Sequence, residues 1–394
     1  MSWPQVKLES VFEIARGGSP RPIDDYITDA DDGLNWISIK DASNSDKYIE
    51  KTKLKIKPEG LSKTRQVKPG DFLLTNSMSF GRPYIMKTTG CIHDGWLVLS
   101  GNPEKVDSDY FYHLLGSDLL KRRFSALAAG AVVKNLNIDL VKGVEIPLPP
   151  LPEQKRIAAI LDKADAIRRK RQQAIQLADD FLRAVFLDMF GDPVTNPKGW
   201  PSVKLGEVCG VGSSKRVFVD EFTDTGVPFY RGTEVGALGE GQKIQAELFI
   251  SQEHYDDLVS HSGAPEVGDL LLPSICHDGR IWKVNHKEQF YFKDGRVLWI
   301  KLNRELIDSD YLRSYLQRMF LSNYSAIASG TTFAELKIVN LKAMNILSPP
   351  LALQRKFSEL VKAISETGKL YANADLEGED LFSSLAKQAF SGQL

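Results

Sequence analysis

The segment Pro149-Pro150-Leu151-Pro152 introduces a stretch of chain that contains no further Pro or Gly until Gly191. Proline suits the first turn of a helix, so the sequence predicts a helix of about 39 residues, roughly 58 Å long at 1.5 Å per residue. Apolar residues recur along it at intervals of three and four, which is typical of a helix that packs lengthwise against another helix. They are Ile157, Ile160, Ala164, Ile167, Ala174, Ala178, Phe181 and Val185, and Arg171 interrupts this stripe.

The same segment returns about 200 residues later as Pro349-Pro350-Leu351, and Gln354 follows it as Gln154 follows the first copy. A second apolar stripe continues from it, although Gly368 and Gly378 favour a kinked or interrupted helix. Two matching stripes are expected to pack on each other as a pair of long antiparallel coiled-coil helices, which would fix the distance between the parts that they join. The second stripe comprises Phe357, Leu360, Ile364, Tyr371, Ala374, Leu381 and Leu385.

The repeat extends over the whole chain, because motifs from the first half recur in the second at nearly the same shift. We therefore expect two similar mixed α/β domains, residues 1–148 and 193–347, separated by the paired helices, residues 149–192 and 348–394. This pseudo-two-fold internal repeat suits an extended partner with two similar sites. The recurring motifs are Trp3-Pro4 and Trp200-Pro201, Gly70-Asp71 and Gly268-Asp269, and Ser108-Asp109-Tyr110 and Ser309-Asp310-Tyr311.

Within each expected domain, short apolar runs alternate with Gly, Pro, Asp and Ser, which is the pattern of strands joined by turns. A helix is expected from Ser108 to about Leu127, with Ser108 as its N-cap, and its repeat counterpart is expected to begin at Ser309. Both domains are therefore predicted to be mixed α/β. The expected strands include Trp36–Ile39, Phe72–Leu74, Trp96–Leu99, Val144–Ile146, Pro228–Tyr230, Leu270–Leu272 and Val297–Ile300.

The composition is that of an ordinary globular protein, with 394 residues, 42% hydrophobic and 26% charged. The sequence has no apolar run of about 18 residues and no signal-peptide pattern, so a cytoplasmic protein without a membrane span is expected. Cys91, Cys209 and Cys276 are unclustered and are interpreted as reduced thiols. The net charge of −1 differs from that of strongly basic, sequence-independent nucleic-acid binders. The lysine-rich stretch 47–68 is either a solvated edge strand or a binding surface.

Apparent catalytic motifs do not recur at equivalent positions of the repeat. His93-Asp94-Gly95 and His277-Asp278-Gly279 fall at different points of their copies, since Asp294-Gly295 is the better match to Asp94-Gly95. Glu335-Leu336-Lys337 resembles part of a nuclease motif, but its counterpart Asn135-Leu136-Asn137 has no carboxylate. The sequence also lacks a phosphate-binding glycine loop, a nucleophile elbow and zinc-ligand spacing, so no catalytic residue, metal site or cofactor is expected in this chain.

The segment Pro147–Ile157, followed by a long basic helix, resembles the central conserved region of type I restriction–modification specificity subunits. The tail Leu381–Gly392 is similar to the end of their second conserved region. The second half departs from the family pattern, with Ala352-Leu353-Gln354 for Pro-Glu-Gln and Gly212-Ser213-Ser214-Lys215 for a glycine loop. Loops that resemble those of the family's target-recognition domains are Gly17-Gly18-Ser19-Pro20, Trp36–Asp41, Gly70–Leu74 and Gly130–Asn135.

The resemblance implies a DNA-reading subunit without catalytic residues of its own. Each domain would read one half of a split, asymmetric double-stranded DNA sequence, and the paired helices would dock two modification (methyltransferase) subunits. Those subunits would use S-adenosylmethionine to methylate adenine, and restriction subunits would add translocation and cleavage that use ATP and magnesium. The alternatives are a stand-alone methyltransferase or nuclease, and a coiled-coil scaffold that joins proteins.

Loops that carry Arg, Lys, Asn, Ser and Thr can reach base edges and phosphates, and they supply the candidate DNA-binding residues. The basic run Arg168–Arg171 on the first long helix is interpreted as a solvated face or as a patch that faces DNA or a partner subunit. The first-half candidates are Ser19, Arg21, Lys40, Asn76, Ser77, Ser79, Arg82, Lys134 and Asn135. The second-half candidates are Arg231, Thr233, Ser274, His277, Arg280, Thr331 and Thr332.

Overall fold

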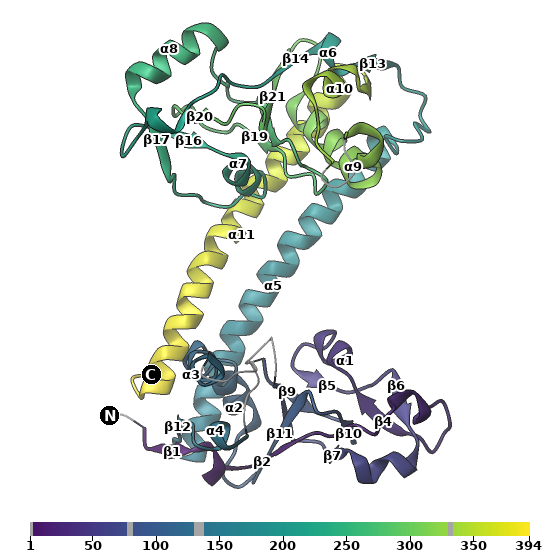
Figure 1. Cartoon of the computed structure of the whole chain (residues 1–394), viewed down its shortest axis with the longest axis vertical. Helices are drawn as coiled ribbons and strands as arrows, with labels where there is room; N and C mark the ends of the chain where they lie inside the picture. Colours follow the sequence, from purple (N-terminus) through teal and green to yellow (C-terminus); the bar gives the residue numbers. More distant parts are fainter. Residues whose placement is uncertain (1–2, 77–81, 130–137, 330–333) are drawn as a thin grey trace. The chain divides into compact units, whose positions relative to one another are not determined.

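The protein is seen in a computed structural model (Figure 1) that describes residues 3–76, 82–129, 138–329 and 334–394, without the side chains of 128–129 and 367–380. It divides into two compact units, named here unit 1 (Met1–Gln173 with Ala372–Leu394) and unit 2 (Ala174–Tyr371). Each unit combines one α/β part with portions of the two long helices, α5 (Leu151–Phe190) and α11 (Leu351–Ser391). The predicted mixed α/β composition is confirmed for both units.

Unit 1 contains two five-stranded sheets, and its main core lies between the first sheet and the helices α2 and α5. Phe72, Tyr110 and Ile157 are fully buried in this core. In order across the first sheet, the strands are β2 (Phe12–Arg16), β11 (Trp96–Gly101), β8 (Phe72–Thr75), β9 (Tyr84–Met86) and β5 (Tyr48–Ile49). The second sheet comprises β3 (Ile27–Thr28), β6 (Leu54–Ile56), β4 (Leu34–Ile37), β10 (Gly90–Ile92) and β7 (Arg65–Val67). The remaining elements are the strand pair β1 (Gln5–Lys7) and β12 (Glu145–Pro147), the helices α1 (Ile39–Ser43), α2 (Ser108–Leu115), α3 (Asp118–Ala129) and α4 (Ile138–Lys142), and 3-10 turns at Leu8–Ser10, Ile23–Asp25 and Pro58–Lys63.

Unit 2 repeats this plan with two four-stranded sheets. Leu298 pairs with Leu272 in its first sheet as Leu97 pairs with Leu74 in unit 1, so the repeat seen in the sequence is a repeat of strand register. The first sheet comprises β14 (Cys209–Gly212), β21 (Val297–Leu302), β18 (Leu270–Pro273) and β19 (Trp282–Lys283), and the second β15 (Phe222–Thr223), β17 (Leu248–Ile250), β16 (Val227–Tyr230) and β20 (Tyr291–Phe292). The remaining elements are the strand pair β13 (Ser202–Lys204) and β22 (Asn345–Leu347), the helices α6 (Leu205–Val208), α7 (Gly232–Gly239), α8 (Gln252–Ser262), α9 (Ser309–Ile327) and α10 (Ile338–Ala343), and a 3-10 turn at Val219–Glu221.

A buried glutamine ties the start of each long helix to its α/β part. Both helices begin directly after the Pro-Pro pair, as the sequence predicts. The backbone N–H of Asp107 donates to Oε1 of Gln154, and Nε2 of Gln154 donates to the Pro149 carbonyl, both at 2.9 Å. Gln354 makes the equivalent bonds in unit 2, to Asp308 at 2.9 Å and to the Pro349 carbonyl at 2.7 Å. The shared glutamine of the two motifs therefore has a structural role.

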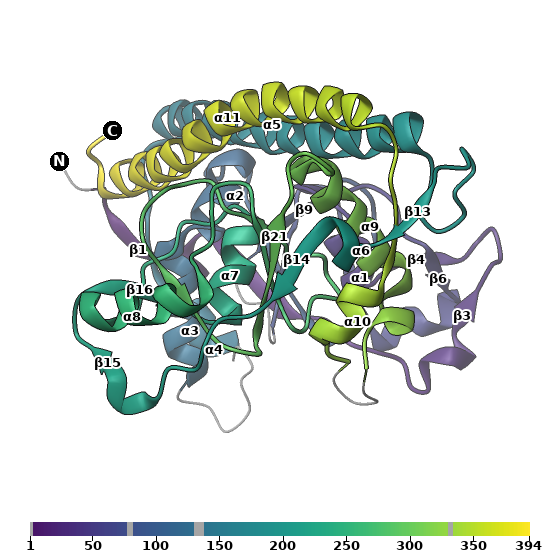
Figure 2. The ribbon, with the colours of Figure 1, turned by 90° about the horizontal axis from the view of Figure 1, so that it is seen from above.

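The two long helices run antiparallel where they meet in unit 1. Arg156 on α5 donates to the backbone oxygen of Leu394, whereas Arg168, three turns later, lies over the ring of Phe382 at 5.6 Å. The last turn of α11 also lies beside the start of the chain, because the indole of Trp3 donates to the Ala389 carbonyl at 2.7 Å (Figure 1 and Figure 2). The predicted antiparallel pairing is thus confirmed within this unit.

Several expectations for the helices were wrong in detail. Asp107, not Ser108, caps α2, because its carboxylate accepts from the N–H groups of Asp109 and Tyr110. The helix expected to continue to Leu127 ends at Leu115, and α3 follows after Gly116 and Ser117. In contrast, α11 is one continuous helix despite its two glycines, since each costs only about 1 kcal/mol in a helix.

The apolar stripes are also less buried than the heptad pattern predicts. Ile167 and Phe181 on α5 are 45% and 54% exposed, and Leu360 and Leu381 on α11 are 37% and 58% exposed. An α-helix advances 3.6 residues per turn, so a stripe of 3.5-residue period drifts away from the buried face over several turns unless the helices supercoil. Tyr371 and Ala374 belong to the part of α11 whose side chains are outside the described set.

Candidate nucleic-acid interface

Three of the predicted DNA-binding residues of unit 1 meet at Asp94. The Ser19 hydroxyl donates to one carboxylate oxygen of Asp94 at 3.2 Å, and the Arg21 guanidinium donates to the other at 3.0 Å. The Asn76 amide donates to the backbone oxygen of Asp94 at 2.7 Å, as does Nε of Arg16, also at 2.7 Å. Partial burial opposes ionisation of Asp94, but Ser19 and Arg21 hold the pKa of its carboxyl below the usual value. Asp94 therefore organises loops that are more than 70 residues apart in the chain.

The corresponding loop of unit 2 is built with different donors. In unit 1, the backbone N–H groups of Gly17 and Gly18 donate to the carbonyls of Trp96 and Ile92. In unit 2, the hydroxyls of Ser213 and Ser214 donate to the carbonyls of Val297 and Phe292. The two loops thus close on equivalent strands with different chemistry, and they present different groups to the surface.

The arginine of this second loop was not among the predicted residues. Arg216 donates to the Asp294 carboxylate at 3.2 Å, as Arg21 does to Asp94. Asp294 was matched to Asp94 in the sequence, and their common role supports that match. Arg16 was also missed, and the available signal for both residues was an arginine within a few positions of a Gly- or Ser-rich loop that ends a strand.

Two predicted residues lie in the interior and do not face solvent. Asn76 and Ser274 are 2% and 3% exposed, respectively. Both follow the equivalent strands β8 and β18, and their backbone N–H groups donate to the carbonyls of Gly95 and Arg296, which directly precede the neighbouring strands β11 and β21. We therefore interpret them as residues that position the loops. This corrects their expected place on the surface.

The remaining first-half candidates that the structure describes are Lys40 and Arg82. Lys40 lies exposed on α1 and, within the described residues, makes no side-chain hydrogen bond or ion pair. Arg82 donates to the backbone oxygens of Ser45 and Asp46, at 3.2 and 2.9 Å, and its guanidinium lies 5.4 Å from the ring centre of Tyr84. Lys40 is free to reach a phosphate, whereas Arg82 would have to leave these contacts.

The basic second-half candidates are held by acidic neighbours. Arg231 is paired with Glu234, and with Glu247 at 2.7 Å. Partial burial raises the pKa of Glu234, but the hydrogen bond from Arg231 and bonds from backbone N–H groups outweigh it and lower the pKa to about 2. Arg280 donates to Asp278 at 2.6 Å. The other two described candidates are Thr233, whose hydroxyl donates to Glu234 at 3.0 Å, and His277, whose ring lies 6.2 Å from that of Tyr324. The candidates Ser77, Ser79, Lys134, Asn135, Thr331 and Thr332 lie outside the described residues.

The apparent catalytic motifs have structural roles in unit 2. Glu335 pairs with Arg296, and Leu336 is 2% exposed within the core.

Burial raises the pKa of the Cys91 thiol to about 11 and that of Cys276 to about 12, so both thiols are protonated near neutral pH and are poor nucleophiles. Among the residues that the structure describes, no group of three His, Cys, Asp or Glu could hold a metal ion.

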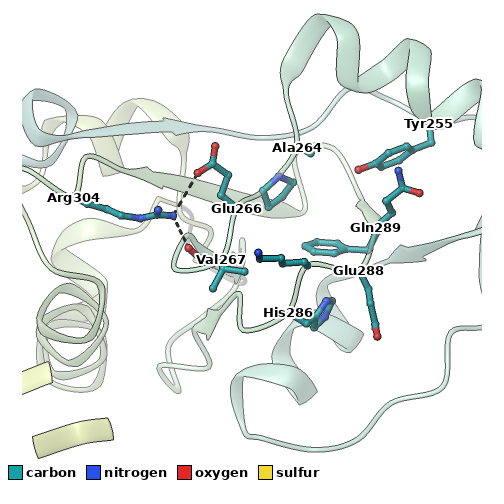
Figure 3. A pocket seen from close by; sticks show the side chains of 11 residues that line it. Tyr255, Ala264, Glu266, Val267, His286, Glu288, Gln289 and Arg304 are labelled. Carbon is teal, nitrogen blue, oxygen red and sulfur yellow. Dashed lines mark hydrogen bonds and ion pairs between the residues drawn. The ribbon is translucent and has the colours of Figure 1, made fainter. Parts of the chain in front are cut away.

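Unit 2 also contains a cavity of about 360 Å³ (Figure 3). Arg304 lies at its edge, where it donates to the Val267 carbonyl at 2.5 Å and pairs with Glu266 at 3.5 Å. Tyr255 and His286 line other parts of the cavity. Its lining combines Tyr255 of α8 with residues of three loops, and no nucleophile lies hydrogen-bonded to a base among these residues. The arrangement does not indicate catalysis.

The basic run on α5 is partly neutralised by one carboxylate. Asp165, whose side chain is 11% exposed, accepts from Arg168 at 2.8 Å and from Arg169 at 2.6 Å. Burial opposes ionisation of Asp165, but the two guanidinium groups hold the pKa of its carboxyl below the usual value. At least this part of the run is therefore a paired network and not simply a solvated face.

Replacing Asp165 with Asn is expected to lower the free energy of unfolding by about 2 kcal/mol at pH 7. Because the pKa is depressed in the folded protein, the stabilisation is present above the unfolded-state value of about 3.9 and is lost as the pH falls through the folded value. Urea unfolding of both proteins between pH 7 and pH 3.5 checks this. The difference should shrink below about pH 4, and a constant difference would contradict the ionic origin of the effect.

Comparison with known proteins identifies the family. A family model described as the type I restriction modification DNA specificity domain matches residues 2–177 and again residues 197–374. The chain is 24% identical to the type I restriction enzyme MjaIX specificity subunit of Methanocaldococcus jannaschii, over 92% of this chain and 87% of that protein. It is 25% identical to the EcoKI specificity subunit of Escherichia coli K12, over 100% of this chain and 89% of that protein.

Solved structures show the same fold. The S subunit of a type I restriction–modification system from M. genitalium matches with a TM-score of 0.60 at 16% identity, covering 99% of this chain and 96% of that one. A chain from a study of complex assembly and conformational transition in a type I system matches with a TM-score of 0.54 at 19% identity, covering 100% of this chain and 98% of that one. With two copies of the specificity domain in tandem, the chain belongs to the family of type I restriction–modification specificity subunits.

Proposed function

We propose that this chain is the sequence-reading, non-catalytic subunit of a type I restriction–modification complex. Each α/β part reads one half of a split sequence in double-stranded DNA. The proposal rests on the match of the DNA specificity domain to both halves of the chain. The candidate contacts are the loops around Asp94 in unit 1 and around Asp294 in unit 2, where an arginine meets an aspartate from a distant segment.

The two half-sites should differ in sequence. Two identical readers would favour two identical half-sites, but the loops at the equivalent strand ends carry Gly17-Gly18 in unit 1 and Ser213-Ser214 in unit 2. Lys40 on α1 is free to contact a phosphate, whereas Arg231, the N-cap of α7, is held by two glutamates. Phosphate contacts set the position of a protein on DNA and base contacts select the sequence, so such differences favour an asymmetric site.

The long helices are proposed to dock the partner subunits. Large apolar side chains are exposed along them: Leu177 is 68% exposed, Phe181 54% and Leu381 58%. Exposed apolar residues that recur on one element favour burial by another protein. The partners would be two modification subunits, which carry S-adenosylmethionine, and restriction subunits, which use ATP and magnesium.

No described helix is long and apolar enough to cross a membrane. We propose that the chain works in the cytoplasm, where its partners meet DNA.

Exchanging residues 1–148 for those of another family member is expected to change one half-site completely and to leave the other unchanged. The chimera would be produced with its modification subunit, and methylated positions would be mapped across a genome. The matched exchange of residues 193–347 should change the opposite half-site. A change at both half-sites after a single exchange would contradict independent readers, and methylation of one uninterrupted sequence by the parent complex would contradict the proposed function itself.

A further inference from the structure

Unit 1 contains a cleft of about 900 Å³ that none of the roles above explains. It lies among α2, α3 and the parts of α5 and α11 that belong to this unit. Phe382, Ala386 and Phe390 of α11 supply apolar surface. Arg122 of α3 and Arg168 of α5 stand among its charged lining residues. An aromatic floor with basic walls is typical of a binding surface, since it combines apolar area with charged groups that can orient a ligand.

Comparison of the two units explains the cleft, because side chains of unit 2 occupy the position that is open in unit 1. Phe190 and Phe390 are equivalent, since each packs on the tyrosine of the repeated Ser-Asp-Tyr motif, with ring centres 4.7 Å apart in unit 2 and 5.8 Å in unit 1. One helical turn earlier, unit 2 has Phe186, which is 1% exposed, and unit 1 has Ala386. Unit 1 therefore lacks an aromatic ring that its repeat buries.

A second substitution enlarges the same place. In unit 2, the Arg318 guanidinium lies 4.9 Å from the ring centre of Phe186, over its face. Counting from the repeated Ser-Asp-Tyr motif, the residue at this position in unit 1 is Ser117, which lines the cleft. Both differences remove side-chain volume from unit 1. The cleft of unit 1 therefore lies at the position where unit 2 packs the side chains of Phe186 and Arg318.

The charge of the lining selects an acidic occupant. Six basic and three acidic side chains line the cleft. Asp165 is shared between Arg168 and Arg169, Asp46 pairs with Arg169 at 3.1 Å, and Asp118 lies 3.7 Å from Lys121. The basic excess remains after these pairings, and it surrounds an apolar floor. An occupant that brings both carboxylates and an aromatic ring would satisfy both features.

We propose that this cleft docks an acidic protein segment of the modification subunit, which inserts an aromatic side chain beside Ala386 and places carboxylates against Arg122 and Lys387. This inference rests on the proposed function. Duplex DNA fits the cleft poorly, because its phosphates would meet the basic walls while its stacked bases could not reach the apolar floor without being flipped out. Since Phe186 occupies the equivalent place in unit 2, the docking contact is specific to unit 1.

A photocrosslink identifies the occupant directly. Ser383 lines the cleft and is exposed, so p-benzoylphenylalanine at this position would reach the occupant without filling the floor. The full chain would be assembled with its purified modification subunit and a DNA duplex that carries the recognition sequence, irradiated, and mapped by mass spectrometry. The expected product joins position 383 to a segment of the modification subunit that carries an aromatic residue flanked by Asp or Glu. A crosslink to DNA, or to a segment without these residues, would overturn the proposal.

Two variants test the contact by affinity. Ala386→Phe should fill the cleft as Phe186 fills unit 2, and Arg122→Glu should reverse its charge. Each is expected to weaken binding of the purified modification subunit about tenfold or more, measured by isothermal titration. The matched controls are Ser10→Phe, which adds the same ring at an exposed position of unit 1 outside the cleft and the long helices, and Lys105→Glu, which reverses an exposed charge elsewhere in unit 1.

The outcomes separate this inference from the proposed function. Thermal unfolding of each variant shows whether it remains folded. If the unaltered chain binds the modification subunit and both cleft variants bind it equally well, the cleft is not a docking site. If the unaltered chain does not bind the modification subunit at all, the proposed function itself fails.

Discussion

Replacing Gln154 with Ala is expected to lower the free energy of unfolding by about 4 kcal/mol, because one buried and two partly buried backbone groups would lose their partner and the side chain would leave a cavity. Gln154 is 1% exposed. Its Oε1 accepts from the N–H of Asp107, and its Nε2 donates to the carbonyls of Pro149 and Lys105 at 2.9 and 3.0 Å. An unsatisfied buried polar group costs about 1–3 kcal/mol, and the cavity left by the side chain adds to this cost. Urea unfolding followed by circular dichroism measures the loss.

The same helix supplies a control for this change. Gln173 is exposed on α5, and its replacement by Ala should alter stability by no more than about 0.5 kcal/mol. Gln354 makes two of the equivalent bonds in unit 2, so Gln354→Ala should also be strongly destabilising. If Gln154→Ala were no more destabilising than Gln173→Ala, the glutamine could not be what ties α5 to the α/β part of unit 1.

Replacing Gly17 with Ala is expected to destabilise unit 1 by about 3 kcal/mol and to abolish reading of its half-site. A Cβ atom at this position would lie 2.0 Å from the backbone oxygen of His93 and 2.7 Å from its carbonyl carbon. These are backbone atoms, so the loop itself must move. The loop carries Ser19 and Arg21 to Asp94, and its displacement would separate the residues that form the candidate interface.

The second half again provides the control, because a Cβ atom on Gly212, the last residue of β14 before the corresponding loop, would meet nothing within 4 Å. Gly212→Ala should therefore leave stability and both half-sites nearly unchanged. Methylation mapping of complexes that contain each variant checks the effect on sequence reading, and urea unfolding checks the effect on stability. Equal behaviour of the two variants would mean that the close approach at Gly17 does not hold the loop.

The long helices and the buried strands of this protein were largely predictable from its sequence. The Pro-Pro-Leu segments correctly marked the starts of α5 and α11, because proline at a helix start and an uninterrupted run without proline are local properties of the chain. The strands around Leu74 and Leu272 were also predictable, since short apolar runs bounded by turn residues form buried strands wherever they occur. The repeat reinforced both predictions, because each pattern appeared twice.

The details of the interface were less predictable. The choice of Asp107 as the cap of α2 depended on which of two adjacent polar side chains turned toward the helix end. The burial of Asn76 depended on a bond to Asp94, a residue from another loop. The sequence marked both as polar residues in suitable loops. It could not show which of them would face the interior, because that depends on partners distant in the chain.

The sequence by itself determined the repeat, the positions of the long helices, the mixed α/β class and, through its motifs, the family to which the chain belongs. Those features follow from periodicity and turn chemistry, which act over a few neighbouring residues. Only the tertiary structure decided that Asp94 gathers Ser19 and Arg21, that Gln154 joins α5 to the loop before α2, and that Ala386 leaves open a cleft that Phe186 fills in the other unit. These outcomes depend on the packing of segments that are far apart in the chain. At such a contact, the presence or absence of one large side chain decides whether the core is closed or a cleft remains.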